Sequence, residues 1–518
     1  MILAVLIAIP LLGGLAAWLA GRKSALASRI ISLAALAADF ILVILLWARH
    51  GGELALRPGA AWVEEIQASW VPRFGIGFHL ALDGLSLVLV ALTVFLGLMS
   101  VLVSWREIRE RVGFFHFNLI WVLAGILGVF LALDLFLFYF FWELMLIPMY
   151  FLIGIWGHER RVYASTKFFL FTQAGGLLML VSILALYVIH GRATGVYSFD
   201  LSVLLGTPLS GSAAWLIMLG FLAAFLVKLP AVPIHSWLPD AHTEAPTAGS
   251  VVLAGLLLKT GAYGLLRFVL PLFPDAAHRF APIGMALGVV GIIYGAHLAF
   301  AQRDFKRLVA YTSVSHMGYV LLAVFALNTL ALQGAVLQIV CHALSTGGLF
   351  ILAGVLQERI HTRDLEVMGG LWEKVPRMGG AGMFLVLASL GLPGLGNFVA
   401  EFLVLAGTYQ RSVLVAVLAS LGFIVSMVYS LKIMQKVFFG KKEREWELPD
   451  LGAREVLVFA LIAVLLLWLG LYPQLFLDTA SGTIDRISVG LAPESGASTI
   501  PSPPASPAPV LTSEGGRR

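Results

Sequence analysis

The sequence is poor in cysteine and in charged residues. It has 518 residues and a single cysteine, Cys341. One thiol excludes a disulfide within the chain, and it also excludes an iron–sulfur cluster held by several cysteines of this chain. Only 12% of the residues are charged, whereas 60% are hydrophobic. That balance excludes a soluble domain and a disordered chain, and it indicates a protein that crosses a membrane many times.

Basic residues are also absent from the N-terminal segment. Residues 1–20 are apolar, with neither a basic start nor a clear cleavage site. We therefore interpret them as the first membrane span and not as a cleavable signal. The net charge of +5 comes from basic residues dispersed between apolar runs, so it gives no indication of nucleic-acid binding.

Long apolar segments dominate the rest of the chain. A helical span needs about 17–25 residues that are mostly apolar. Fourteen segments meet this need, at 1–20, 29–48, 82–104, 114–132, 134–156, 167–190, 213–238, 247–271, 281–301, 308–326, 331–355, 380–408, 412–435 and 455–477. We expect an all-α, polytopic membrane protein with about 14 transmembrane helices.

The loops between these segments differ in charge. Those on one side carry 21 Lys and Arg residues, and those on the side of the two termini carry 9. Because cytoplasmic loops are the more basic ones, we expect a multi-pass membrane protein with both termini on the side opposite the cytoplasm. The tail 492–518 is rich in Pro and Ser, which predicts disorder.

Parts of the sequence recur after five spans. Leu-Pro occurs at 229–230 and again at 392–393, and aspartates open two apolar segments at Asp134 and Asp304. Five is odd, so consecutive copies enter the membrane from opposite sides. We expect two inverted five-helix repeats with discontinuous helices in spans 7 and 12. The expected division is 1–113 (spans 1–3), 114–271 (first repeat, spans 4–8), 281–435 (second repeat, spans 9–13), 455–477 (span 14) and 492–518 (tail).

Span 7 combines a lysine with two prolines. Lys228 lies in an apolar run, where an ionised side chain is costly and usually faces the bundle interior. Pro230 and Pro233 are expected to free the carbonyls of Leu226 and Leu229. A broken helix with a buried charge is typical of a transporter site.

Glu143 lies near the middle of span 5 and is the candidate partner of Lys228. One interpretation is an ion pair that strengthens and weakens as a proton passes. The other is a static pair that holds two helices together, although a buried pair is no more stabilising than apolar packing.

Two further titratable residues lie near the centres of their spans. Lys259 is too deep in span 8 to reach either surface, and burial can bring a lysine towards neutrality. His342 in span 11 has Ser345 and Thr346 near it and can relay protons in both directions. The alternatives are a lysine bonded to carbonyls of a neighbouring helix and a histidine that only packs.

Glu401 follows the Leu-Pro break in span 12. Pro393 is expected to free the carbonyl of Ser389. Because span 12 runs outward, Glu401 lies past its middle and suits a terminal proton acceptor on an exit path. The alternative is a glutamate that merely reaches water at the interface.

Other polar residues form a candidate secondary proton path. His235 and His242 flank the segment after the first break, where an uptake funnel, a rigid capped turn or, least favoured, a metal site are the alternatives. Tyr311, Ser313 and His316 form a polar strip in span 10.

Four segments carry a resemblance to a known family: FFWELMLIPMYFLIGIWGHERR, FLVKLPAVPIHSWLPDAHTEAPTAGSVVLAGLLLKTGAYG, YTSVSHMGYV and GNFVAEF. They resemble the antiporter-like subunits of respiratory complex I, and the similarity extends to about residue 477. The resemblance implies a non-redox subunit of a proton-pumping translocase. NADH, FMN, iron–sulfur clusters and quinone are expected in partner subunits, with no cofactor or metal in this chain. The implied partners are adjacent antiporter-like membrane subunits and the lipid bilayer.

The resemblance also implies which residues carry protons. The family's path falls on Glu143, Lys228, Lys259 and Glu401. The glutamate in span 12, where sister chains have lysine, favours the M-type branch of the family. The tail past 492 matches no role in the family, and the long lateral helix of the L-type sister is absent.

Other classes of protein stay open at this point. A cation/proton antiporter subunit of the Mrp type, or a chain of a membrane hydrogenase, would share the broken helices and the lysines. A haem-carrying subunit would need paired axial histidines on facing helices. The mid-span histidines His297, His316 and His342 have no repeated spacing that indicates such a pair.

Overall fold

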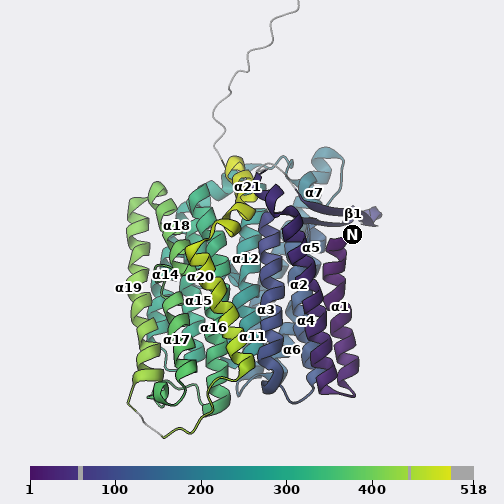
Figure 1. Cartoon of the computed structure of the whole chain (residues 1–518). Coiled ribbons are helices and arrows are strands. Elements are labelled where there is room, and N and C mark those ends of the chain that lie inside the picture. Colours follow the sequence, from purple (N-terminus) through teal and green to yellow (C-terminus); the bar gives the residue numbers. More distant parts are fainter. Residues whose placement is uncertain (57–61, 442–444, 492–518) are drawn as a thin grey trace, which may run out of the picture.

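The protein is a bundle of long helices that run roughly parallel to one another (Figure 1). The computed structural model describes residues 1–56, 62–441 and 445–491. The tail 492–518, for which the sequence predicts disorder, lies outside the described residues. Within them, thirteen helices are long and apolar enough to cross a membrane. The expectation of an all-α fold with many membrane spans is thereby confirmed.

The bundle helices follow the predicted order. They are α1 (Ile2–Gly21), α2 (Ala25–Leu56), α3 (Gly84–Glu107), α4 (Val112–Leu131), α5 (Leu135–Leu144), α6 (Leu146–Trp156), α7 (Arg161–Thr194), α9 (Gly211–Lys228), α10 (Trp237–Glu244), α11 (Thr247–Val252), η2 (Leu253–Leu257), α12 (Leu258–Gly264), η3 (Leu265–Val269), α13 (Leu270–Leu272), α14 (Pro274–Ala301), α15 (Phe305–Ala326), α16 (Thr329–Ile360), α17 (Pro376–Ser389), α18 (Gly396–Arg411), α19 (Val413–Ile433), η5 (Met434–Phe439) and α20 (Ala453–Leu471). The remaining elements are β1 (Glu64–Val71), η1 (Pro72–Phe74), β2 (Ile76–Leu82), α8 (Leu201–Leu204), η4 (Leu371–Glu373) and α21 (Gln474–Gly490).

The difference between fourteen predicted spans and thirteen long helices lies in span 12. The predicted segment 380–408 is divided between α17 and α18, and each is too short to cross alone. The segment between the two helices contains Gly391 with a φ angle of 80° and Gly394 with a φ angle of 94°. Residues with a Cβ rarely adopt such angles. The Leu-Pro signal therefore located the break in the helix correctly.

Both predicted helix breaks keep more backbone hydrogen bonds than proline alone suggests. The carbonyl of Leu226 is not free, because it accepts from the amide of Ala231 at 2.9 Å. The second break has the same pattern, since the amide of Leu392 donates to Leu387 at 3.1 Å. At the first break this i to i+5 bond replaces the i to i+4 bond that Pro230 removes. At the second break the i to i+5 bond lies before the carbonyl of Ser389, whose i to i+4 bond Pro393 removes. The expectation of a free carbonyl at Leu226 was therefore wrong.

Span 8 is continuous but irregular. Two π-helical turns, η2 and η3, lie on either side of α12, which carries Lys259. The whole helix Thr247–Leu272 is surrounded by other helices, and its most apolar window is fully buried. Such π turns commonly occur at functional positions, because they displace side chains and backbone carbonyls from regular helical geometry.

An antiparallel β-hairpin and a short helix extend the bundle at the end where the chain begins (Figure 1). Neither the hairpin nor this helix was predicted from the sequence. Strands β1 and β2 pair from Glu64 opposite Leu82 to Val71 opposite Ile76, and Gly75 turns the chain with φ 67°. The helix α21 packs on α2, α3 and α16. Neither element is long and apolar enough to be found by span length.

A buried histidine fastens the hairpin to the bundle. The His79 imidazole contacts Asp200 through Nδ1 and Glu65 through Nε2, the latter at 2.8 Å. Burial lowers the pKa of His79, but the hydrogen bonds and charges of Asp200 and Glu65 outweigh it, so the pKa lies above its ordinary value.

This histidine predicts that the hairpin loosens as pH rises. A raised pKa means that the folded hairpin binds the proton more tightly than the open one. The stabilisation is therefore complete below the ordinary pKa of 6.5 and is lost as pH rises through the folded pKa of His79. Amide hydrogen exchange of residues 64–82, corrected for intrinsic rates, is expected to be faster at pH 8.5 than at pH 6. The variant His79→Gln should remove the difference, and equal exchange of the native hairpin at both pH values would contradict the prediction.

Candidate functional site

Lys259 lies at the centre of the bundle with no exposed surface. Its Nζ donates to the carbonyl of Ala254 at 2.7 Å, and this carbonyl belongs to the π turn η2. The same Nζ lies 2.5 Å from Nδ1 of His342 on α16. The carbonyl belongs to the lysine's own helix and not to a neighbouring helix, as one alternative expected, and the contact with a neighbouring helix is the one to His342.

His342 links this lysine to a second histidine. Its ring centroid is 5.6 Å from that of His316 on α15, with the planes 64° apart. Nε2 of His342 is buried and has no hydrogen-bond partner among the described residues. A buried nitrogen without a partner is costly and unusual, which favours a working group over a packing residue.

His316 lies against Glu401, which extends the row to α18. Nδ1 of His316 is 2.9 Å from Oε1 of Glu401, and both side chains are about 2% exposed. Gln338 donates to the same carboxylate oxygen at 2.9 Å. On its other nitrogen, His316 lies 3.3 Å from the Ser389 hydroxyl and 3.4 Å from the Tyr429 hydroxyl.

Four titratable side chains thus form one buried row, namely Lys259, His342, His316 and Glu401. All four residues were predicted from the sequence. His316, however, was assigned only to the secondary proton path, whereas it lies between His342 and Glu401 in the row. Gln338, Ser389 and Tyr429 were missed. Gln338 was the one that a pattern could reveal, since it precedes His342 by four residues and so shares its helix face.

Lys228 and Glu143 lie near one another without forming an ion pair. The Lys228 ammonium stands over the rings of Trp142 and Phe168, 5.3 and 5.4 Å from their centroids. Its Nζ has no hydrogen-bond partner among the described residues, and the same is true of the buried Oε1 of Glu143. The two charges still influence one another. The direct pair expected from the sequence is therefore not formed in this structure, because two ring faces hold the ammonium instead.

The helix that ends at Lys228 touches the helix of Lys259. Gly261 on α12 packs so closely on α9 that an added Cβ would lie 2.6 Å from the Phe225 carbonyl oxygen and 3.1 Å from the Lys228 Cβ. Glycine permits this close approach because it has no side chain. The Lys228 segment and the buried row therefore form one neighbourhood.

Apart from His316, the residues of the expected secondary proton path do not lie in the buried row. His235 lies edge-on to Tyr294 and 6.4 Å from the ring of Tyr311. The Ser313 hydroxyl donates to the carbonyl of Val309 in its own helix, so it does not extend the row.

His242 lies closer to the row. Its ring stacks on Phe350 at 4.4 Å, and both of its nitrogens are buried without a hydrogen-bond partner in the described parts of the chain. The charges of Lys306 and Lys259 both act on it. Lys306 itself is buried and donates to the carbonyl of Ala245 at 3.1 Å. His242 therefore lies between the central lysine and the loops below it.

A polar pocket of about 500 Å³ opens among those loops. Its lining residues are His158, Glu159, Arg303, Asp304, Gln357, His361, Thr362, Arg363 and Asp364. Burial lowers the pKa of His158 to about 3, and the charges of Lys306 and Arg363 act in the same direction. His158 is thus neutral at physiological pH, and its Nε2 lies 3.3 Å from Nε2 of Gln357.

Among the residues that the structure describes, no group of three or more His, Cys, Asp or Glu side chains is arranged to hold a metal ion. The buried row consists instead of nitrogen and carboxylate groups in pairwise contact. The chemistry open to such a row is the exchange of protons between neighbours, since each member can gain or lose a proton.

Comparisons with known proteins identify the family to which the chain belongs. The family model described as "NADH:quinone oxidoreductase/Mrp antiporter, TM" matches residues 132–426. The chain is 52% identical to NADH-quinone oxidoreductase subunit M of Escherichia coli (strain K12), over 94% of this chain and 97% of that protein. A chain of respiratory complex I from Thermus thermophilus with bound NADH superimposes with a TM-score of 0.85 at 32% identity, covering 95% of this chain and 100% of that one.

A more distant structure has the same fold. A chain of the Mrp complex from Dietzia sp. DQ12-45-1b matches with a TM-score of 0.80, over 94% of this chain and 99% of that one. At 21% identity this likeness shows the fold alone. Together with the buried row, these matches confirm the resemblance seen in the sequence: the chain belongs to the NADH:quinone oxidoreductase/Mrp antiporter family of membrane subunits.

Proposed function

We propose that this chain is a proton-translocating membrane subunit, of the subunit M type, in a NADH:quinone oxidoreductase. It would couple electron transfer from NADH to quinone, carried out in partner subunits, to proton movement across the membrane. One observation carries the proposal: four titratable side chains, from Lys259 to Glu401, contact one another in the buried core. The high identity to subunit M chains supports the electron-transfer complex over a free-standing antiporter.

The first contact in the row can pass a proton without large movement. Two hydrogen-bond donors cannot face each other across 2.5 Å, so Nζ of Lys259 and Nδ1 of His342 share one proton. Either the ammonium donates to a bare Nδ1, or a neutral amine accepts from the imidazole. When Nδ1 takes the proton, the ring would release one from Nε2, the nitrogen without a protein partner among the described residues, to a bound water that carries it to His316.

The same exchange operates at the outer end of the row. His316 accepts a proton on one ring nitrogen and releases one from the other, and Nδ1 faces the Glu401 carboxylate at 2.9 Å. Gln338 donates to that carboxylate and so stabilises its charged form until a proton arrives. Glu401 acts as the terminal acceptor before release.

Lys228 and Glu143 act as the switch that drives the row. In the present arrangement the ammonium rests on ring faces, and the carboxylate is apart from it. If Glu143 approaches, its charge holds the proton on Lys228. If it recedes, the lysine gives the proton up more readily. Rearranged charge in a neighbouring subunit would change the separation between the two side chains.

The same proposal includes two inverted repeats, 114–271 and 281–435. Asp134 caps α5, and its backbone forms an isolated antiparallel β-bridge with Asp200. In the same way, Asp304 caps α15 and forms an isolated antiparallel β-bridge with Asp364. Matching proline breaks with i to i+5 bonds also support the relation. The division into 1–113, the two repeats, 455–477 and the tail follows from it.

Location and cofactors complete the proposal. We place the chain in a bacterial inner membrane with both termini on the periplasmic side, because the opposite loops carry most of the Lys and Arg residues. Protons would then enter at the polar pocket and pass His242 towards Lys259. NADH, FMN, iron–sulfur clusters and quinone belong to partner subunits in this scheme.

Removing either member of the switch tests the proposal. In membranes that carry Glu143→Ala or Lys228→Ala, NADH-driven proton pumping is expected to fall about tenfold, because a positioned proton-transfer group is lost. The measurement is the quenching of a pH-sensitive dye in inverted vesicles, beside native-gel analysis of assembly. The exposed pair Glu366 and Lys436, 2.7 Å apart, provides a matched control, since alanine there should leave pumping unchanged. Normal pumping by an assembled Glu143 or Lys228 variant would reject the assignment.

A further inference from the structure

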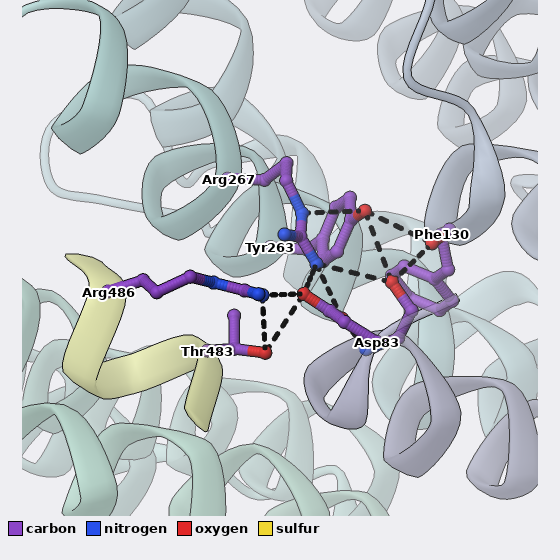
Figure 2. A network of polar contacts seen from close by, with 7 residues as sticks. Asp83, Phe130, Tyr263, Arg267, Thr483 and Arg486 are labelled. Carbon is purple, nitrogen blue, oxygen red and sulfur yellow. Dashed lines mark hydrogen bonds and ion pairs between the residues drawn. The ribbon is translucent and has the colours of Figure 1, made fainter. Parts of the chain in front are cut away.

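A second polar network lies at the outer end of the helix that carries Lys259 (Figure 2). At its centre is Asp83, which caps α3 and is 1% exposed. Its carboxylate accepts from Arg267 at 2.7 Å and from the Ser86 amide at 2.9 Å. Although burial raises the pKa of Asp83, the charge and hydrogen bonds of Arg267 hold it below its ordinary value. Asp83 is therefore ionised.

Arg267 is fixed from several directions. Nε donates to the Tyr263 hydroxyl at 3.1 Å, and one terminal nitrogen reaches Ser86 Oγ at 3.3 Å as well as Asp83. The guanidinium also lies over the ring of Trp62, 5.1 Å from its centroid. The Tyr263 hydroxyl donates a hydrogen bond to the carbonyl of Phe130 at 3.0 Å.

The helix α21 covers this network from outside. Thr483 donates to Asp83 Oδ2 at 2.9 Å, and Arg486 reaches the same oxygen at 3.3 Å (Figure 2). The backbone of α21 also lies directly against α3, because a Cβ on Gly84 would be 1.6 Å from the Thr479 carbonyl oxygen. Little space is therefore left between the cover and the end of α3.

The network differs from the buried row in one chemical respect. Members of the row and the switch have open positions: Lys228 Nζ, His342 Nε2 and Glu143 Oε1 are buried without hydrogen-bond partners. In contrast, Asp83, Tyr263 and Arg267 have no buried side-chain nitrogen or oxygen that lacks a hydrogen-bond partner. A guanidinium does not give up its proton in proteins, and a carboxylate bound by several donors does not readily accept one.

Arg267 lies on the same helix as Lys259, closer to the outer surface. Arg267 is eight residues beyond Lys259 on the same helix, which is roughly 12 Å at 1.5 Å per residue. A proton that moved outward from Lys259 along this helix would reach the guanidinium before the outer surface. Fixed positive groups of this kind exclude protons from pores.

We infer that the Asp83–Arg267 pair, covered by α21, is a proton barrier that closes the direct route between Lys259 and the outer surface. Protons on Lys259 are thereby directed sideways through His342 to Glu401, and protons outside cannot return to Lys259. The inference rests on the proposed function, because it assumes that Lys259 carries protons.

The variant Arg267→Gln tests the barrier in the whole complex reconstituted in liposomes. Without the guanidinium, Asp83 can take up a proton and pass it on. Passive proton leak under an imposed pH gradient, without NADH, is expected to rise several-fold. During turnover fewer protons should be pumped per NADH, while the rate of NADH oxidation is maintained. Arg49→Gln, which changes an exposed arginine at the same end of the bundle, should have no effect on the leak.

Two further variants separate a barrier from a purely structural role. In Arg267→Gln with Lys259→Ala the leak should return to the native level, because the leak passes through Lys259. A leak that persists in the double variant reflects a disturbed bundle and overturns the inference. Thr483→Val removes one bond to Asp83 with little change of shape, and a smaller leak is expected. If Arg267→Gln does not assemble, Thr483→Val decides, and a native leak overturns the inference.

The two proposals fail in different ways. Native leak in Arg267→Gln, combined with lost pumping in Lys259→Ala, overturns the barrier and leaves the proton row intact. Native pumping in Lys259→Ala overturns the proposed function, and the barrier with it.

Discussion

Replacing Lys259 by alanine is expected to reduce NADH-driven proton pumping by at least ~10-fold, the largest effect of any single change in this chain. Its Nζ links the π turn η2, through the Ala254 carbonyl, to the His342 ring. Without the amine, His342 loses its proton donor, and a cavity opens in the buried centre of the bundle. Inverted vesicles with a pH-sensitive dye would measure pumping, and NADH oxidation would be followed in the same preparation.

A second lysine gives a demanding control for this variant. Lys432, near the end of α19, also donates to backbone carbonyls, those of Phe300 at 2.7 Å and Gln302 at 2.9 Å. It has no place in the buried row, so Lys432→Ala should pump at nearly the native rate. If an assembled Lys259→Ala complex pumps as well as Lys432→Ala, Lys259 does not carry protons.

The second large effect is expected at His316. Changing His316 to glutamine keeps a side chain that can hydrogen-bond to Glu401 but removes the group that gains and loses a proton. Pumping should fall about as far as in His316→Ala, roughly tenfold, because the row is interrupted in both. Dye quenching in vesicles compares the two variants directly.

The comparison distinguishes a relay from a scaffold. A scaffold role predicts that His316→Gln pumps normally and that only His316→Ala fails. Tyr429→Phe serves as the control, since it removes one 3.4 Å contact to the other ring nitrogen of His316 and leaves the row complete. Its pumping should stay close to the native rate.

The membrane spans could be predicted from the sequence because apolar length is a local property. The breaks at Pro230 and Pro393 could be predicted for the same reason, since proline acts on its own helix. Lys228 and Lys259 stood out because a charge in an apolar run is costly wherever the chain folds.

Contacts between distant segments could not be predicted in this way. Lys259 and His342 are 83 residues apart, and no local pattern places one nitrogen on the other. The central position of His316 depends on how α15 packs against both α16 and α18, which also contact one another. Lys228 and Glu143 were expected to pair because opposite charges attract, but the ring faces of Trp142 and Phe168 compete for the ammonium.

The aromatic surroundings of Lys228 have a further consequence. An oxygen ligand would bind the ammonium strongly and the neutral amine weakly, so each loss of a proton would break a bond. Ring faces attract the cation but also pack well against the uncharged form. In the proposed mechanism, Trp142 and Phe168 would therefore let Lys228 gain and lose its proton without movement of the two rings, while the position of Glu143 decides which charge state is favoured.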